Sequence, residues 1–154
     1  MAASGDIPAL ELLMNCGYTT DTRADDQSTA LHCAARSGQA RTVQYLLERG
    51  ASCEAWNDKY RTPLHEAILS SDSDTVKVLI QHKSEDYRTY LSSHPLRMLT
   101  IIHIAARYGN IEVVKQLLRK DDKAVSFRDR EGKTPLYYAA FKRHWEVVHL
   151  LLQH

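Results

Sequence analysis

One seven-residue phrase occurs four times in this chain and constrains the fold more than any other feature of the sequence. Its copies are residues 29–35 (TALHCAA), 62–68 (TPLHEAI), 100–106 (TIIHIAA) and 134–140 (TPLYYAA). The threonines that open them are 33, 38 and 34 residues apart. Self-similarity at a near-constant period is typical of repeat architectures, in which each unit packs on its neighbours. The sequence therefore predicts a helical solenoid with one enlarged loop.

Each phrase carries the residues that begin a helix. The threonine hydroxyl suits an N-cap, and two copies continue with proline, which is tolerated at the first helical position. We expect a short inner helix that ends near Gly38, Ser71, Gly109 or Arg143. Glycine favours the left-handed conformation that ends many helices, so Arg143 is predicted to be strained there or to adopt another geometry.

A second, more apolar helix is predicted after each inner helix. The segments that start at Thr42, Thr75, Val113 and Val147 place apolar residues in a broad stripe. One short inner helix is too small to cover such a stripe. Neighbouring repeats must therefore stack to bury it.

With these elements in this order, the chain resembles the ankyrin repeat family, whose unit of about 33 residues is a β-turn followed by two antiparallel helices. Gly50-Ala51, the segment from Asn57 to Arg61 and the phrase from Thr62 to His65 match the family's glycine, hairpin and TPLH elements in order. Tyr60 and Met98 stand where a hairpin glycine is expected. The resemblance implies an all-α ankyrin-repeat solenoid of stacked helix-turn-helix units with short β-hairpin fingers.

The resemblance covers nearly the whole chain. We expect a single domain over residues 1–154, with a half repeat at 1–23 and repeats at about 24–56, 57–94, 95–128 and 129–154. Terminal repeats need a polar outer face, but the last predicted helix carries Trp145, Val148 and Leu152. We therefore favour a segment of a longer protein over a complete small protein with improvised caps.

Composition excludes several classes of partner. Twenty Lys and Arg against nineteen Asp and Glu give a net charge of +1, so we expect no nucleic-acid binding. The longest apolar runs are far shorter than the roughly 20 residues that span a bilayer, so we expect no membrane insertion. Three cysteines without CxxC spacing favour a reducing compartment, the cytoplasm or the nucleus. We expect a monomeric segment.

No residue pattern points to catalysis, a metal or a cofactor. His32, His65 and His103 occupy equivalent positions on helices that stack roughly 8–10 Å apart, too far apart to share one zinc ion. The resemblance instead implies that this histidine forms hydrogen bonds within and between turns. Cys33 adjoins His32 but points to another face of the helix, so the two make no nucleophile and base pair. We predict that the chain is not an enzyme.

The resemblance implies that a partner protein or peptide binds the hairpin tips and the exposed face of the inner helices, which line a concave groove. Those positions are rich in arginine and aromatic residues, the types that dominate interface hot spots. The candidate partner-binding residues are Arg23, Arg36, Trp56, Asp58, Lys59, Arg61, Leu69, Tyr87, Tyr90, Arg107, Tyr108, Arg128, Arg130, Tyr138, Phe141 and Lys142.

Three places within this set have alternative interpretations. Trp56 either contacts a partner or packs on the neighbouring hairpin. The basic residues from Arg107 to Lys142 either bind an acidic or phosphorylated segment or are ordinary solvated charges. The enlarged loop at residues 81–99 has no closing glycine, and its Tyr87 and Tyr90 either anchor a partner or fold back over the third hairpin.

Two hypotheses about function follow. The first is a scaffold or adaptor that recognises a protein without catalysis. The second is a regulatory or substrate-recruiting array of a larger enzyme, ubiquitin-ligase adaptor or channel. The repeated phrase fixes the fold and is shared by binders of unrelated targets, so it does not name the partner.

Overall fold

The computed structural model describes residues 6–82 and 100–154, which belong to two compact units. Unit 1 is Met1–Ser84 and unit 2 is Glu85–His154. In the described residues every regular element is helical, which confirms the predicted all-α class.

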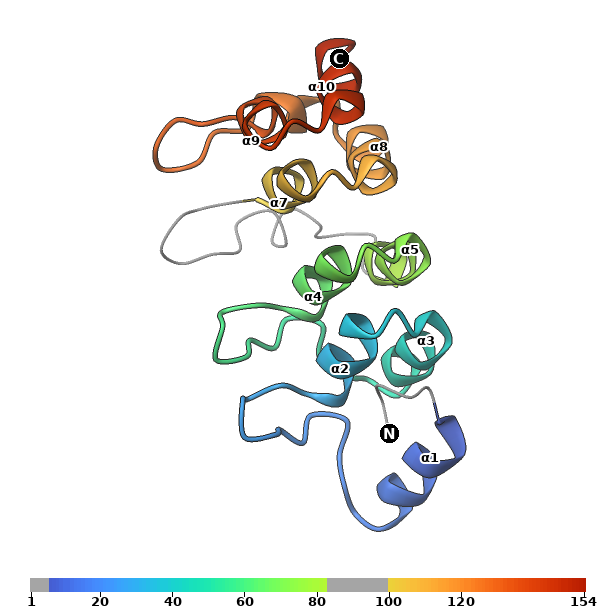
Figure 1. Cartoon of the computed structure of the whole chain (residues 1–154). Coiled ribbons are helices and arrows are strands. Elements are labelled where there is room, and N and C mark those ends of the chain that lie inside the picture. Colours follow the sequence, from blue (N-terminus) through green and yellow to red (C-terminus); the bar gives the residue numbers. More distant parts are fainter. Residues whose placement is uncertain (1–5, 83–99) are drawn as a thin grey trace. The chain divides into compact units, whose positions relative to one another are not determined.

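The described residues of unit 1, 6–82, form one helix followed by two helix pairs. Its elements are α1 (Ile7–Asn15), α2 (Ala30–Arg36), α3 (Ala40–Glu48), α4 (Pro63–Ser70) and α5 (Ser73–His82). Inner helices α2 and α4 lie side by side, and so do outer helices α3 and α5 (Figure 1). Their facing side chains form the core, in which Leu31, Val43, Ile68 and Val76 are fully buried.

Unit 2 repeats the same arrangement. Its elements are α7 (Ile101–Tyr108), α8 (Ile111–Lys120), the 3₁₀ helix η2 (Asp122–Ser126), α9 (Pro135–Phe141) and α10 (Trp145–Leu152). Inner helix α7 packs on α9, and outer helix α8 packs on α10. Two small residues of α7, Ala105 and Ala106, lie in this core with no exposed surface.

The inner helices begin at the threonines of the repeated phrase, as predicted. In α2, α4 and α7 the backbone N–H of Thr29, Thr62 or Thr100 donates to Nδ1 of the histidine three residues later, at 3.1–3.3 Å. The hydroxyls of these threonines lie 2.7–2.9 Å from the same nitrogen. The phrase is therefore a self-contained helix cap.

Turns precede three of the inner helices, at residues 23–29, 56–62 and 128–134, and are called the first, second and last fingers below. Each is closed by backbone hydrogen bonds, for example from Asn57 to Arg61 at 3.1 Å and from Asp129 to Lys133 at 3.0 Å. The fingers stand where β-hairpins were predicted, but their strands do not pair into a ladder in the described residues. Within the described ranges the pairing amounts to one isolated antiparallel bridge, between Arg23 and Thr29.

Candidate functional site

A buried carboxylate organises the inner face of unit 1. Glu66 lies on α4 with 2% of its surface exposed. Its two carboxylate oxygens accept hydrogen bonds from Arg36 on α2, from Nε at 3.1 Å and from Nη2 at 3.2 Å. Asn57 of the second finger donates to the same carboxylate at 3.0 Å, and Arg61 lies 3.7 Å away. One acidic side chain therefore joins two inner helices and a finger.

The charges of this cluster stabilise each other. Burial alone would raise the pKa of Glu66, but hydrogen bonds from Arg36 and Asn57 hold that pKa below its usual value. The hydrogen bond with Glu66 likewise raises the pKa of the Arg36 guanidinium. Arg36 also donates to the Ser28 hydroxyl at 3.3 Å. Arg36 and Arg61, two of the candidate partner-binding residues, are thus already engaged within unit 1.

The first and second fingers are linked through Arg23. Its Nη1 donates to the backbone oxygen of Trp56 at 2.8 Å and to that of Gln27 at 3.2 Å. The Trp56 ring lies 6.0 Å from the ring of His65, on the helix α4 that follows the second finger, and Trp56 remains 36% exposed. Neither of the two sequence-based interpretations included this contact with His65.

Unit 2 has a different polar cluster on its inner face. Asp129 of the last finger is buried, and its Oδ2 accepts a hydrogen bond of 2.6 Å from the Tyr138 hydroxyl on α9. Its Oδ1 accepts from the backbone N–H groups of Lys133 at 2.8 Å and Glu131 at 2.9 Å. Burial opposes ionisation of Asp129, but these hydrogen bonds keep its pKa below the usual value.

Tyr138 lies between the last finger and α7. Its ring meets that of His103 edge-on at 5.8 Å. Burial, followed by the hydrogen bond to Asp129, raises the pKa of Tyr138 to about 12. The phenol is therefore a hydrogen-bond donor at neutral pH. The charge of Arg107 on α7 also acts on this phenol, in the opposite sense.

Aromatic and cationic side chains surround this cluster on the surface of α7 and α9. Tyr108 is 47% exposed and Phe141 is 68% exposed. Phe141 stacks on Tyr137 at 6.0 Å, and Lys142 Nζ lies 5.8 Å from the Phe141 ring centre. We call Arg107, Tyr108, Tyr138, Phe141 and Lys142 together the α7/α9 surface.

Comparison with known proteins agrees with this helical architecture. A family model described as ankyrin repeats (3 copies) matches residues 1–90 and again residues 88–154. The chain belongs to the ankyrin repeat family. Ankyrin repeats are in general non-catalytic modules that bind other proteins.

Relatives of this ankyrin array include much longer proteins. The chain is 28% identical over 149 residues to the Drosophila melanogaster transient receptor potential cation channel subfamily A member 1. That match covers 97% of this chain and 10% of the relative. The chain is 35% identical over 65 residues to the human ankyrin repeat and SAM domain-containing protein 3, covering 42% of this chain and 10% of that protein. The array thus spans about a tenth of the length of these relatives.

A solved structure shares the fold. The crystal structure of the human ASB11 ankyrin repeat domain matches with a TM-score of 0.81 and 26% sequence identity. The match covers 99% of this chain and 66% of that one.

The histidines of the ankyrin phrase have the structural role that the resemblance implies. Because Nδ1 of His32 accepts a backbone N–H, the proton is on Nε2, which donates to the backbone oxygen of Arg61 at 2.9 Å. His103 does the same toward Lys133 at 3.1 Å. Within residues 6–82 and 100–154, no group of three histidine, cysteine or acidic side chains could hold a metal ion.

The remaining candidate residues are dispersed. Asp58 and Lys59 are exposed at the tip of the second finger, and Leu69 is half-buried on α4. In the last finger Arg130 is exposed, while Arg128 donates to the backbone oxygen of Gly132 at 3.0 Å. Tyr87 and Tyr90 lie outside the described residues. Their role, like that of the whole candidate set, stays a prediction.

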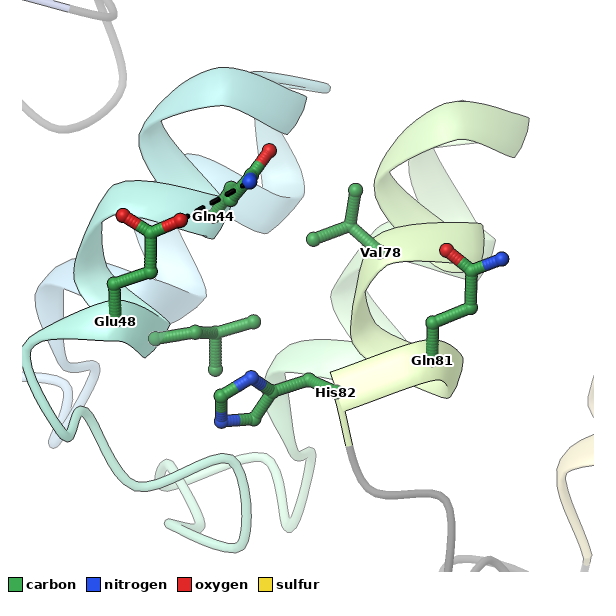
Figure 2. A pocket seen from close by; sticks show the side chains of 6 residues that line it. Gln44, Glu48, Val78, Gln81 and His82 are labelled. Carbon is green, nitrogen blue, oxygen red and sulfur yellow. Dashed lines mark hydrogen bonds between the residues drawn. The ribbon is translucent and has the colours of Figure 1, made fainter.

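The outer helices of unit 1 also form a hollow of about 270 Å³ between α3 and α5 (Figure 2). Gln44 and Glu48 line one side and are hydrogen-bonded to each other at 3.0 Å, while Val78, Gln81 and His82 line the other. The polar side chains of the hollow are exposed and do not point to a common centre (Figure 2); they are Gln44, Glu48, Gln81 and His82. The lining of this hollow has no buried network of hydrogen bonds like the one around Glu66.

The candidate set omitted the two acidic residues that organise the inner faces. Glu66 and Asp129 each hydrogen-bond a side chain nine residues away, Asn57 and Tyr138 respectively. The sequence signal for these clusters was an exchange at two equivalent positions. Asn57 and Glu66 in one repeat correspond to Asp129 and Tyr138 in another, so the donor and the acid change places.

No helix among the described residues is long and apolar enough to cross a membrane.

Proposed function

We propose that this chain is a scaffold or adaptor segment that binds a partner protein or peptide without catalysis, mainly through the α7/α9 surface of unit 2. The observation that carries the proposal is the exposure there of large aromatic rings beside cations. Tyr108 and Phe141 leave roughly half or more of their surface in solvent, at 47% and 68%. Such rings stabilise a complex by losing that solvent-exposed area.

The contrast with unit 1 supports the choice of unit 2. In unit 1, Arg36 and Arg61 pair with Glu66, and Arg23 donates hydrogen bonds to backbone oxygens. A guanidinium that already has partners gains little from a second protein, because the existing contacts must first be broken. The exposed parts of Trp56, Asp58 and Lys59 add secondary contacts at the second finger.

Compartment and assembly state belong to the same proposal. Cys16, Cys33 and Cys53 are free thiols, which suits the reducing cytoplasm or nucleus. Burial raises the pKa of the Cys33 thiol, which makes it less reactive. We propose a monomeric segment that folds as one array over residues 1–154.

A regulatory array within a larger protein is the alternative function. The match to the Drosophila channel covers nearly the whole of this chain and a tenth of that protein, which is the relation expected of one module among several. The two functions differ in their consequence. An adaptor only recruits its partner, whereas a regulatory array changes the activity of the protein that contains it.

Photo-crosslinking tests the proposed surface. Short random peptides displayed on phage are selected on the full chain, and a photoreactive phenylalanine is then placed at Phe141 or, as a control, at Arg119 on outer helix α8, which is also exposed. We expect selected peptides to be captured by the chain labelled at 141 and to be captured far less at 119. Failure to select any peptide, or equal capture at the two positions, would contradict the proposal.

A further inference from the structure

The repeat places Arg36 and Arg107 at equivalent positions, each seven residues after the threonine of its phrase. In the same way Glu66 corresponds to Tyr138, and Asn57 corresponds to Asp129. Unit 1 therefore shows what an arginine at this position binds when the next inner helix supplies an acidic residue.

In unit 1 the partner of this arginine is internal. Glu66, on the next inner helix, receives Nε and Nη2 of Arg36 on its two oxygens at 3.1 and 3.2 Å. Arginine binds a carboxylate best in this two-pronged geometry, because the planar guanidinium matches the spacing of the carboxylate oxygens. The Arg36 charge is neutralised within the fold.

In unit 2 the internal carboxylate is replaced. Tyr138 occupies the Glu66 position and donates its hydroxyl to Asp129 at 2.6 Å, so donor and acceptor are exchanged relative to Asn57 and Glu66. Asp129 also accepts two backbone N–H groups, which occupy its other oxygen. Among residues 6–82 and 100–154, no carboxylate lies within the 4.0 Å salt-bridge distance of the Arg107 guanidinium.

The backbone of Arg107 is held in place at the end of α7. Arg107 is half-buried, and its backbone oxygen accepts a hydrogen bond from His144 Nε2 at 3.1 Å. The His144 ring lies against Gly109, where a Cβ atom would come within 2.5 Å of it. A guanidinium with no carboxylate at salt-bridge distance among the described residues can take the carboxylate of another protein in the two-pronged geometry.

The surrounding charge favours an acidic occupant as well. Lys142 Nζ is beside the exposed Phe141 ring, and Lys133 Nζ lies 4.9 Å from the Tyr137 ring centre. The acidic side chains nearby are engaged, since Glu131 pairs with Lys133 and Asp129 binds Tyr138. The potential at this surface is therefore complementary to an acidic residue that is flanked by apolar ones.

We propose that Arg107 binds the side-chain carboxylate of an Asp or Glu of the partner protein, which takes the place that Glu66 fills against Arg36 in unit 1. This inference rests on the proposed function and adds the chemistry of the partner. The aromatic rings of Tyr108 and Phe141 contact the residues beside that acid. Unit 2 thus retains the arginine, and the partner supplies the carboxylate that Glu66 supplies in unit 1.

The phage-selected peptides are the probe for this inference. We expect them to share an Asp or Glu, and we expect its replacement by Asn or Gln to weaken binding by about tenfold or more. Arg107→Gln should weaken binding by a similar factor, with little further loss when both changes are combined. Arg107→Lys should retain part of the affinity, because it keeps the charge but loses the two-pronged geometry.

Arg119→Gln is the matched control, because it removes the same charge from the same unit on outer helix α8. It should leave peptide affinity unchanged, and thermal melts should show that every variant is folded. Peptides that crosslink at position 141 but bind Arg107→Gln as tightly as the wild type would overturn this inference and leave the proposed function standing. If no selected peptide maps to the α7/α9 surface, both are contradicted.

Discussion

At the residue scale, the histidines of the ankyrin phrase work as neutral connectors. Each of His32 and His103 accepts a backbone N–H on Nδ1 and donates from Nε2 to a carbonyl in the following finger. Protonating Nδ1 would remove the acceptor and place a charge in the core. Burial accordingly lowers the pKa of both rings below 6.5.

This lowered pKa gives stability a definite dependence on pH. The unfolded chain binds protons at these histidines near pH 6.5, whereas the folded chain binds them only at lower pH. The stabilisation is therefore fully present above pH 6.5 and is lost as the pH falls through the folded pKa. We expect the urea midpoint of unfolding to fall as the pH is lowered from neutral through this range.

Nuclear magnetic resonance titration of the imidazole protons checks the cause directly. The His103 signal, assigned with a His103→Gln variant, should titrate below pH 6.5. A His103 pKa above 6.5, or a urea midpoint that rises on acidification, would show that the folded ring is charged and that the connector account is wrong.

The sequence predicted the role of these histidines but not that of Glu66. The family resemblance implied the histidine bonds, which join one phrase to the finger that follows it. The pair of Arg36 and Glu66 joins residues 30 positions apart on neighbouring helices, and it depends on how two long side chains meet in the stack. A pattern of residue types does not specify that meeting.

At the element scale, the ends of the inner helices are more uniform than their residues. Positions 38, 71, 109 and 143 are all left-handed, with φ of 65°, 59°, 73° and 62°. Glycine fills the first and third, but Ser71 and Arg143 adopt the same conformation despite their Cβ atoms. Packing of the next outer helix therefore imposes the turn even where the residue disfavours it.

Replacing Arg143 by glycine should relieve this strain. We expect Arg143→Gly to raise the free energy of unfolding by about 0.5–1 kcal/mol, because the gain in the left-handed region exceeds the entropic cost of glycine. Lys142→Gly is the control, since Lys142 has an ordinary φ of −91°. Chemical denaturation measures both. A destabilised Arg143→Gly variant would show that the arginine side chain contributes more than its backbone strain costs.

The finger turns follow the same rule. Gln27, Tyr60 and Gly132 occupy equivalent positions two residues before the phrase, and all have positive φ, at 56°, 53° and 74°. The absence of glycine at Tyr60 was visible in the sequence, yet the turn geometry is retained. The starts and ends of the helices could thus be predicted from the repeat. The described fingers form no ladder of strands, because their backbone hydrogen bonds do not continue beyond each turn.

At the scale of the molecule, the two units use the same scaffold with opposite electrostatic outcomes. Unit 1 neutralises the arginine of its inner helix with Glu66, whereas unit 2 holds Arg107 beside a neutral phenol. A net charge of +1 for the whole chain conceals this difference. The sequence identified Arg107, Tyr138 and Phe141 as candidates, but the reason to prefer them over Arg36 came from the paired side chains of the structure.

Transplanting the unit 1 arrangement into unit 2 tests whether Arg107 binds a carboxylate of the partner. The double variant Asp129→Asn with Tyr138→Glu should place an internal carboxylate against Arg107, as Asn57 and Glu66 do for Arg36. Its affinity for a selected acidic peptide, measured by isothermal titration calorimetry, is compared with that of Gln153→Glu, which adds a carboxylate at the exposed end of unit 2.

We expect the double variant to stay folded and to bind the peptide about tenfold or more weakly than the wild type, while Gln153→Glu binds it normally. A folded double variant with undiminished affinity would contradict the claim that the partner's carboxylate occupies the place that Glu66 fills in unit 1.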